Sequence, residues 1–357
     1  MNIKCNKRKG LSPAYLALVA ALLFGGSIPI CKLLIEQISP QFLAGLLYLG
    51  SGIGLTVYRA IFYRIFGTVR ETTLKHEDIP WLAGAIISGG IAAPLLLMLG
   101  LTTTPGTIAS LLLNLEIVFT ALLAWFAFKE NFSNQVIIGM IAIVIGGVLL
   151  SWTPGAHLVI STGSLIIITA CLCWGLDNNL TRNISASDPI QIAAIKGLTA
   201  GLINCAVALM LGSKLPTPSF LVTVTFIGFL GYGISLSLYI KALRYLGTAR
   251  ASVYFSTAPF AGAFLSLLIL HEPLTINFLM AAIFMGIGVW LHLTETHKHE
   301  HSHEDQEHEH VHVHNEHHQH DHSNNDPIKE PHNHLHRHIQ ITHLHEHFPD
   351  IDHRHNH

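Results

Sequence analysis

Long apolar runs follow one another through the first 293 residues of the chain. Each run has about 20 residues, the length that a helix needs to cross a hydrocarbon core of about 30 Å. The runs lie at 12–33, 40–62, 79–101, 105–127, 134–152, 162–182, 188–212, 218–240, 249–270 and 275–293. Backbone N–H and C=O groups cannot stay unpaired in lipid, so each run predicts a helix. The pattern therefore predicts an all-α integral membrane protein with ten transmembrane helices.

Basic residues alternate between the two sides of these predicted helices. With the N-terminus placed in the cytoplasm, thirteen Lys and Arg residues fall in cytoplasmic segments, and only Lys32 and Lys214 fall in outside loops. Cytoplasmic loops carry this excess of positive charge, so both chain ends are expected in the cytoplasm. The first run follows a basic stretch, as a signal peptide would, but it is long and has no evident cleavage site. We therefore expect a retained helix and a multi-pass protein of the cell (inner or plasma) membrane.

The ten helices divide into two sets of five with matching landmarks. The stretch ASLLLNLEIVFTALLAWFAFKE (109–130) corresponds to ASVYFSTAPFAGAFLSLLILHE (251–272), and FGGSIPICK (24–32) corresponds to WGLDNNLTR (174–182). Pro40 and Pro189 follow the second pair at similar distances. Five is an odd number, so the second set enters the membrane from the opposite side. Inverted repeats of this kind are typical of secondary transporters, with the binding site near the midplane between the halves.

This architecture resembles the EamA-domain carriers of the drug/metabolite transporter superfamily. The resemblance covers about residues 12–293 and implies alternating-access transport of a small solute. It divides the chain into a basic N-terminus (1–11), a first repeat (12–152), a linker (153–161), a second repeat (162–293) and a tail (294–357). The second repeat has Pro259 where the family pattern expects proline. The first repeat has Ile117 there, beside Glu116, which suggests a specialised site.

Polar residues inside the predicted spans are the candidate substrate or ion pathway, because charges in lipid are costly and usually mark pathways or pairs. The candidates are Asn114, Glu116, Asp177, Asn178, Lys196, Tyr254 and Ser256. At a rise of about 1.5 Å per residue, Asp177 lies about 8 Å and Lys196 about 10 Å from the same end of their helices. The two could pair and leave Glu116 as the unbalanced group, suited to a proton or a cation.

A purely structural interpretation stays open for several of these residues. Asp177 and Lys196 can form a fixed bridge while the asparagines tie helices together. Glu130 and Glu272 close their helices at the membrane surface and are expected to be structural or interfacial. His271 is expected to be an interfacial residue.

The C-terminal tail differs sharply in composition from the helical body. Residues 297–357 carry 22 of the chain's 26 histidines and twelve of its 22 acidic residues, whereas the body is basic. The tail lacks the aliphatic residues of a core, so we expect it to be disordered when free of ligand. In an extended chain, His-x-His places two imidazoles on one side, a ligand set that suits Zn, Ni, Co or Cu. The proposed ligands include His308, His310, His312, His314, His317, His318, His320 and His322.

The main functional hypothesis is a secondary transporter of a small, metabolite-type solute, coupled to protons or another ion, with a metal-binding regulatory tail. One alternative is a divalent transition-metal transporter, and another is a metal-responsive membrane scaffold or sensor that transports nothing. The sequence has no Walker-type motif and no nucleophile–base constellation, so neither an ATP motor nor an enzyme is expected. No cofactor is expected beyond metal on the tail. The expected partners are the bilayer and the solute or ion, without nucleic acid, and a homodimer is compatible with the sequence.

Overall fold

The structure is a computed structural model, and it describes residues 12–66, 72–128, 133–151 and 161–294, together with four short stretches of the tail. Ten of its helical segments are long and apolar enough to cross a membrane. They coincide with the ten apolar runs, so the predicted all-α membrane architecture is confirmed. The basic N-terminus, most of the predicted linker and Glu130 lie outside the described residues.

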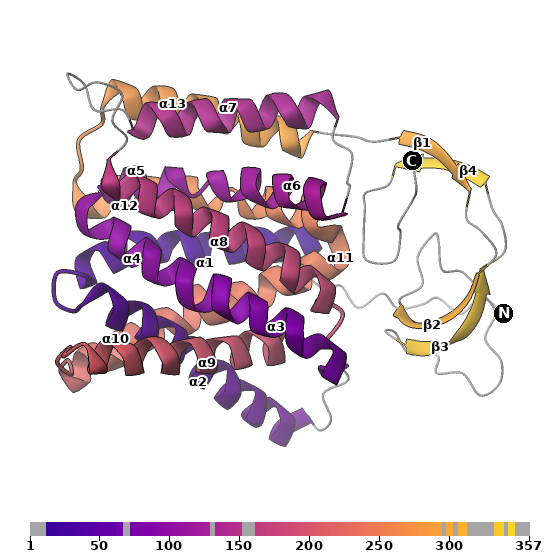
Figure 1. Cartoon of the computed structure of the whole chain (residues 1–357), viewed down its shortest axis with the longest axis horizontal. Coiled ribbons are helices and arrows are strands. Elements are labelled where there is room, and N and C mark those ends of the chain that lie inside the picture. Colours follow the sequence, from indigo (N-terminus) through magenta and orange to yellow (C-terminus); the bar gives the residue numbers. More distant parts are fainter. Residues whose placement is uncertain are drawn as a thin grey trace. The chain divides into compact units, whose positions relative to one another are not determined.

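The first five spans begin with α1 and end with α7 (Figure 1). Two of them, the third and the fourth, contain more than one element, because regular α-helix is interrupted within the span. The bounds are α1 Pro13–Leu34, α2 Pro40–Phe66, η1 His76–Asp78, α3 Ile79–Ala85, η2 Ile86–Ala92, α4 Ala93–Thr103, α5 Gly106–Leu112, α6 Leu115–Phe128 and α7 Asn134–Ser151.

The second five spans repeat this order of elements. Their bounds are α8 Thr162–Ile184, α9 Pro189–Met210, α10 Pro218–Gly228, η3 Phe229–Ile234, α11 Ser235–Phe255, α12 Ala258–Leu270 and α13 Ile276–Leu293. The two halves of α11 belong to different spans. The Tyr239 hydroxyl lies 2.9 Å from the Ser252 hydroxyl, whereas thirteen residues of straight helix would separate them by about 20 Å. The chain therefore folds back on itself within this element.

Several spans begin at a proline that follows a capping residue. Proline is favoured in the first helical turn because its missing N–H would have no partner there. Ser12 caps α1, which starts at Pro13. The Asp188 side chain accepts hydrogen bonds from the backbone N–H groups of Ile190 and Gln191 at the start of α9. These local signals fix where the chain re-enters the bundle.

The packing of the helices shows the internal symmetry. Equivalent helices of the two repeats pair directly, α2 with α9 and α7 with α13, and the α7–α13 pair lies at one edge of the bundle (Figure 1). The first helix of each repeat packs against the other repeat in a corresponding way, α1 on α11 and α12, and α8 on α4 and α6. This arrangement agrees with two inverted five-helix repeats.

Irregular backbone occurs at equivalent places in both repeats. The third and eighth spans each contain a π-helical segment, η2 and η3. The fourth span breaks at Leu113–Asn114, between α5 and α6, and the ninth breaks at Ser256–Thr257, between α11 and α12. Short π segments and broken spans are frequent at functional sites in membrane proteins. Four of the ten spans thus depart from regular α-helical geometry within the bundle.

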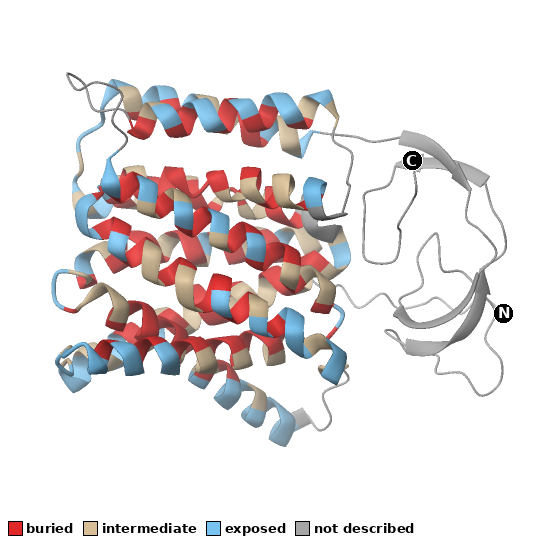
Figure 2. Cartoon of the chain, viewed as in Figure 1, coloured by how far each residue is buried: buried red, intermediate tan, exposed pale blue. Residues whose placement is uncertain are grey.

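Burial follows the pattern of a membrane protein rather than that of a soluble one. Buried residues concentrate on the inner faces of the helices (Figure 2). Large apolar side chains also remain exposed on the outer faces, for example Leu22, Ile87 and Phe126, whose exposed fractions are 60%, 63% and 74%. A large exposed apolar surface of this kind marks contact with another apolar phase. The outer faces are therefore suited to lipid.

The described stretches of the tail are four short strands in two antiparallel pairs. Strand β1 (Lys298–Ser302) pairs with β4 (Thr342–Glu346), and β2 (Gln306–His312) pairs with β3 (His332–His338). These stretches are extended and paired, and the disorder expected of the ligand-free tail stays a prediction. Alternating His-x-His has the period of two that a strand requires. The remainder of the tail, including His314, His317, His318, His320 and His322, lies outside the described residues.

Candidate functional site

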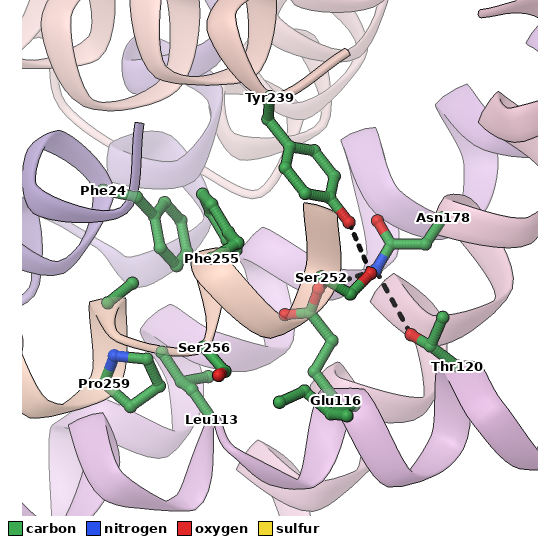
Figure 3. Close-up of a pocket in the computed structure, with 12 residues that line it drawn as sticks. Phe24, Leu113, Glu116, Thr120, Asn178, Tyr239, Ser252, Phe255, Ser256 and Pro259 are labelled. Atoms are coloured by element: carbon green, nitrogen blue, oxygen red, sulfur yellow. Dashed lines mark hydrogen bonds between the residues drawn. The ribbon is translucent and has the colours of Figure 1, made fainter. Parts of the chain in front are cut away.

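A small cavity lies where the broken spans of the two repeats meet (Figure 3). Its volume, as reached by the centre of a water molecule, is about 20 Å³, room for about one water. It is lined by Phe24, Leu113, Glu116, Ile117, Thr120, Asn178, Tyr239, Ser252, Phe255, Ser256, Ala258 and Pro259. Both breaks contribute to this wall, Leu113 from the first repeat and Ser256 from the second. An organic solute can enter only if the surrounding helices separate.

Glu116 is the one acidic side chain in the wall of this cavity. Its Oε1 accepts a hydrogen bond of 2.8 Å from the Asn178 amide, which also donates to the Thr120 hydroxyl at 3.2 Å. Among the residues that the structure describes, no Lys, Arg or His nitrogen lies within 4.0 Å of the Glu116 carboxylate. The carboxyl group is thus oriented by a neutral donor and has no cationic partner within 4.0 Å among the described residues.

Aromatic rings form the other side of the cavity. The centroids of Phe24 and Phe255 lie 5.6 Å apart, and those of Tyr239 and Phe255 lie 4.6 Å apart. Figure 3 shows the Phe24 and Phe255 rings side by side, with the Tyr239 hydroxyl directed toward Ser252. Behind this wall, Trp174 packs edge-on against Phe24 at 5.7 Å. Rings held by other rings in this way are fixed in place before any ligand arrives.

Asp177 and Lys196 form a buried ion pair, as the sequence suggested they could. The Lys196 ammonium donates to Asp177 Oδ2, and the Thr181 hydroxyl donates to Asp177 Oδ1 at 3.1 Å. Both charged side chains are almost completely buried, with exposed fractions of 2% and 6%. The pair lies against η2, where a Cβ on Gly89 would come within 2.0 Å of the Asp177 carboxylate. Only glycine leaves room for the pair at this point of the helix contact.

The structure separates the predicted pathway residues into groups. Glu116, Asn178 and Ser256 line the cavity, and Asp177 and Lys196 neutralise each other. Two further candidates point elsewhere. The Asn114 amide donates to Leu111 O and contacts the Met285 sulfur on α13. Tyr254 packs against an apolar cluster between α1 and α11.

Sequence reasoning missed most of the neutral half of the cavity. Thr120, Tyr239 and Ser252 supply its hydroxyl groups, and Phe24 and Phe255 supply its rings. The one available signal was the Ala-Ser pair that opens the ninth span, since Ser252 is its second residue. Within an apolar span, isolated hydroxyl and aromatic residues are too common to be singled out.

At the end of the bundle that holds Lys32, Glu272 joins the two repeats and Lys32 joins two helices of the first repeat. Glu272 accepts hydrogen bonds from the N–H groups of Gly106 and Thr107 at 2.7 and 2.8 Å, and from the Thr107 hydroxyl at 2.6 Å. The Lys32 ammonium donates to the carbonyls of Leu101 and Thr104. His271, which is left-handed with φ 53°, ends α12 and turns Glu272 toward α5. We call this set the Glu272 clasp.

Two arginines bridge the opposite end, which we call the basic end. Arg59 of α2 lies 3.1 Å from the Asp188 carboxylate at the start of α9. Arg244 of α11 donates to the carbonyls of Ser185 and Ser187 at 3.1 and 2.6 Å. Glu272 and Arg59 therefore join the two repeats at the two ends, whereas Lys32 and Arg244 each join segments of one repeat.

These features define a class of protein. Ten spanning helices in two inverted halves, with broken helices and a polar cavity between them, are the architecture of membrane carriers. The chain belongs to the EamA-like transporter family, whose sequence profile matches residues 11–152 and 161–294. The resemblance found in the sequence is thereby confirmed.

Individual relatives are transporters whose cargo is unnamed. The chain is 26% identical to an uncharacterized transporter of Methanothermobacter thermautotrophicus over 291 residues, which is 78% of this chain and 85% of the relative. It is 24% identical to the uncharacterized transporter YyaM of Bacillus subtilis, over 62% of this chain and 75% of that protein. It is also 24% identical to the uncharacterized inner membrane transporter YicL of Salmonella typhimurium, over 72% and 87%.

A solved crystal structure shares the fold. It aligns with a TM-score of 0.59 at 16% identity, covering 78% of this chain and 95% of the other. At this identity, the likeness extends to the arrangement of helices and not to the residues of the cavity.

Proposed function

We propose that the protein is a secondary carrier that moves a small solute by alternating access, with Glu116 as its central binding and coupling group. The observation that carries the proposal is the position of this carboxylate in a cavity between the broken spans of two inverted repeats. A charge so deep in a bundle is costly to keep and is typically functional. The family and its named relatives support a transporter.

Proton or cation coupling follows from the chemistry of a single carboxylate. Glu116 can hold a proton or a positive charge, but the two compete for the same oxygens. The Asn178 amide orients the group without neutralising it, whereas Asp177 is already satisfied by Lys196. Exclusive occupancy of one site by a proton or a cargo is sufficient to couple their movements in opposite directions.

The direction of insertion is also part of the proposal. The basic end, with Arg59 and Arg244, fits the cytoplasmic side because positive residues gather there in multi-pass proteins. The Glu272 clasp then faces outward, and both chain ends lie in the cytoplasm. Alternating access consists of breaking one of the two sets of end contacts while the other stays intact.

The tail is proposed to bind a transition metal and to regulate the carrier. In the register of β2 and β3, His308 lies opposite His336 and His310 lies opposite His334. His312 continues this series opposite His332, and residues two apart along a strand share a face. This backbone pairing of histidine with histidine supports the proposed metal site, because imidazole suits transition metals.

Transport of the metal itself is less well supported by the body. Among the described residues, no group of three His, Cys, Asp or Glu side chains is placed to hold a metal ion. The cavity offers one carboxylate together with hydroxyl groups and rings, which is a poor ligand set for a soft transition metal. We therefore propose a metal-responsive tail on a carrier of organic solutes.

The test is flux in proteoliposomes under an imposed pH gradient. Purified full chain is compared with Glu116→Gln and with Glu36→Gln, which makes the same change at an exposed position. The expected result is movement of protons when a mixture of metabolites is supplied. This movement should be lost in Glu116→Gln and retained in Glu36→Gln. Equal proton and solute flux in the Glu116 variant and the full chain would overturn the coupling role. No flux above empty vesicles would favour the non-transporting sensor.

A further inference from the structure

The charge of the central cavity limits which solutes it can hold. Three ionised side chains lie in or near it, and two of them, Asp177 and Lys196, cancel. Glu116 is left as the uncompensated charge among the described residues. An anionic cargo would meet this carboxylate in a low-dielectric surrounding, where like charges repel strongly. A positively charged cargo would replace the counterion that the protein itself does not provide.

The wall opposite Glu116 narrows the choice of cation. Phe24, Phe255 and Tyr239 present aromatic surfaces to the same small space (Figure 3). The faces of such rings attract cations within about 6 Å, and aromatic cages are the usual means of holding alkylated ammonium groups. Their spacing, 5.6 and 4.6 Å between neighbouring centroids, leaves them adjacent to one another rather than scattered through the bundle.

An inorganic cation fits this wall less well. Metal ions such as Ca²⁺ or Mg²⁺ require about six oxygen ligands around them, and six of the twelve residues that line this cavity have no polar side-chain atom. An ammonium that carries methyl groups needs fewer acceptors, since much of its surface packs against apolar atoms. Glu116 supplies the balancing charge, and the Ser252 and Tyr239 hydroxyls, 2.9 Å apart, supply polar contacts at one edge.

We propose that the cargo of this carrier is a small organic monocation of the amine or quaternary ammonium class, bound between the Glu116 carboxylate and the rings of Phe24, Phe255 and Tyr239. This inference rests on the proposed transport function and specifies its substrate. It assigns the rings as specificity determinants and the carboxylate as the counterion.

The test is equilibrium binding to the purified full chain in lipid nanodiscs. The probes are radiolabelled choline and its neutral isostere dimethylbutanol, which has the same shape without the charge. We expect saturable choline binding, and binding of the neutral probe weaker by about 30-fold or more, as expected for loss of a buried charge pair. Glu116→Gln should weaken choline binding by a similar factor, and Glu36→Gln should leave it unchanged.

Two changes at one ring separate a specific role from a folding defect. Phe255→Leu should weaken choline binding by roughly 3- to 10-fold, whereas Phe255→Tyr keeps the aromatic face and should restore it. Each variant is first shown to have the gel-filtration profile and unfolding midpoint of the full chain. Equal affinity for the charged and neutral probes, or choline binding that is insensitive to Glu116 and Phe255, would overturn the assignment.

The outcome for the substrate class can be told apart from the outcome for transport. If no ammonium probe binds at millimolar concentration, but vesicles still show Glu116-dependent flux of another solute, the carrier function stands and this substrate class is wrong. If sodium or zinc displaces choline at lower concentration than other ammonium ions do, an inorganic cargo replaces the organic one.

Discussion

The buried pair of Asp177 and Lys196 gives the sharpest test of how charge is arranged in this bundle. Each side chain is at least 94% buried, and the two are in direct hydrogen-bond contact. Removing one partner leaves the other as an uncompensated charge, which typically costs about 3–5 kcal/mol. Asp177→Asn and Lys196→Met should therefore each lower the free energy of unfolding by about that amount.

The double variant should behave very differently from the sum of the single ones. Replacing both groups removes the uncompensated charge, and exchange of a buried pair for neutral residues is often close to neutral. We expect the double variant to be more stable than either single variant, with an interaction energy of about 3 kcal/mol. This lies at the upper end of the roughly 0.5–3 kcal/mol found between residues in contact, and the double-mutant cycle isolates it.

The assay is reversible unfolding in mixed micelles, followed by tryptophan fluorescence and helical circular dichroism at increasing denaturing detergent. Glu36→Gln serves as a control, because Glu36 is exposed and its charge is screened by solvent. It should cost at most about 1 kcal/mol. If the losses at Asp177 and Lys196 simply add in the double variant, the two charges are not coupled, and the account of Glu116 as the unbalanced group fails with them.

Further predictions concern backbone geometry and the tail. Gly89→Ala should lower the free energy of unfolding by about 1–3 kcal/mol, as overpacking does, because the new methyl would meet the Asp177 carboxylate at 2.0 Å. Gly286→Ala is the matched control, because nothing lies within 4 Å of the added methyl. At His271, with φ 53°, replacement by Gly should preserve or raise stability and replacement by Val should lower it by about 1–2 kcal/mol, measured in the same micelle titration. A chain that ends at Glu295 should lose zinc and nickel binding in calorimetry while keeping its helical signal and unfolding midpoint; unchanged metal binding would place the metal site in the body.

The membrane fold could be predicted from the sequence because two strong signals agree. The length and apolarity of the runs gave all ten spans, and the repeated landmarks gave the two halves. The irregular segments could not be predicted in the same way. A π segment such as η2 needs no different periodicity from the α-helix around it. In the second repeat Pro259, which lacks a backbone N–H, accompanies the break, whereas the first repeat breaks at the equivalent place with Ile117 instead.

In the candidate site, the sequence allowed prediction mainly of the charged residues and the polar residues beside them. Glu116 and Asn178 were expected to be close, and the structure joins them by a hydrogen bond. Asn114 was grouped with them because it is two residues from Glu116. The helix breaks at Leu113–Asn114, and the Asn114 amide is directed to Leu111 O and to the Met285 sulfur on α13. The rings of Phe24 and Phe255 are brought together only by packing of α1 on the ninth span, which no local pattern specifies.

The unequal contacts at the two ends have a consequence for the resting state of the molecule. If two inverted halves were identical, the inward-facing and outward-facing forms would be related by symmetry and equally populated. Here Glu272 and Lys32 hold one end, and Arg59 and Arg244 hold the other. Hydrogen bonds to charged groups contribute about 1.5–3 kcal/mol each, so a difference of one such bond shifts the balance at least tenfold. Residues far from the cavity can therefore set which side the empty carrier faces, without any change in what the cavity binds.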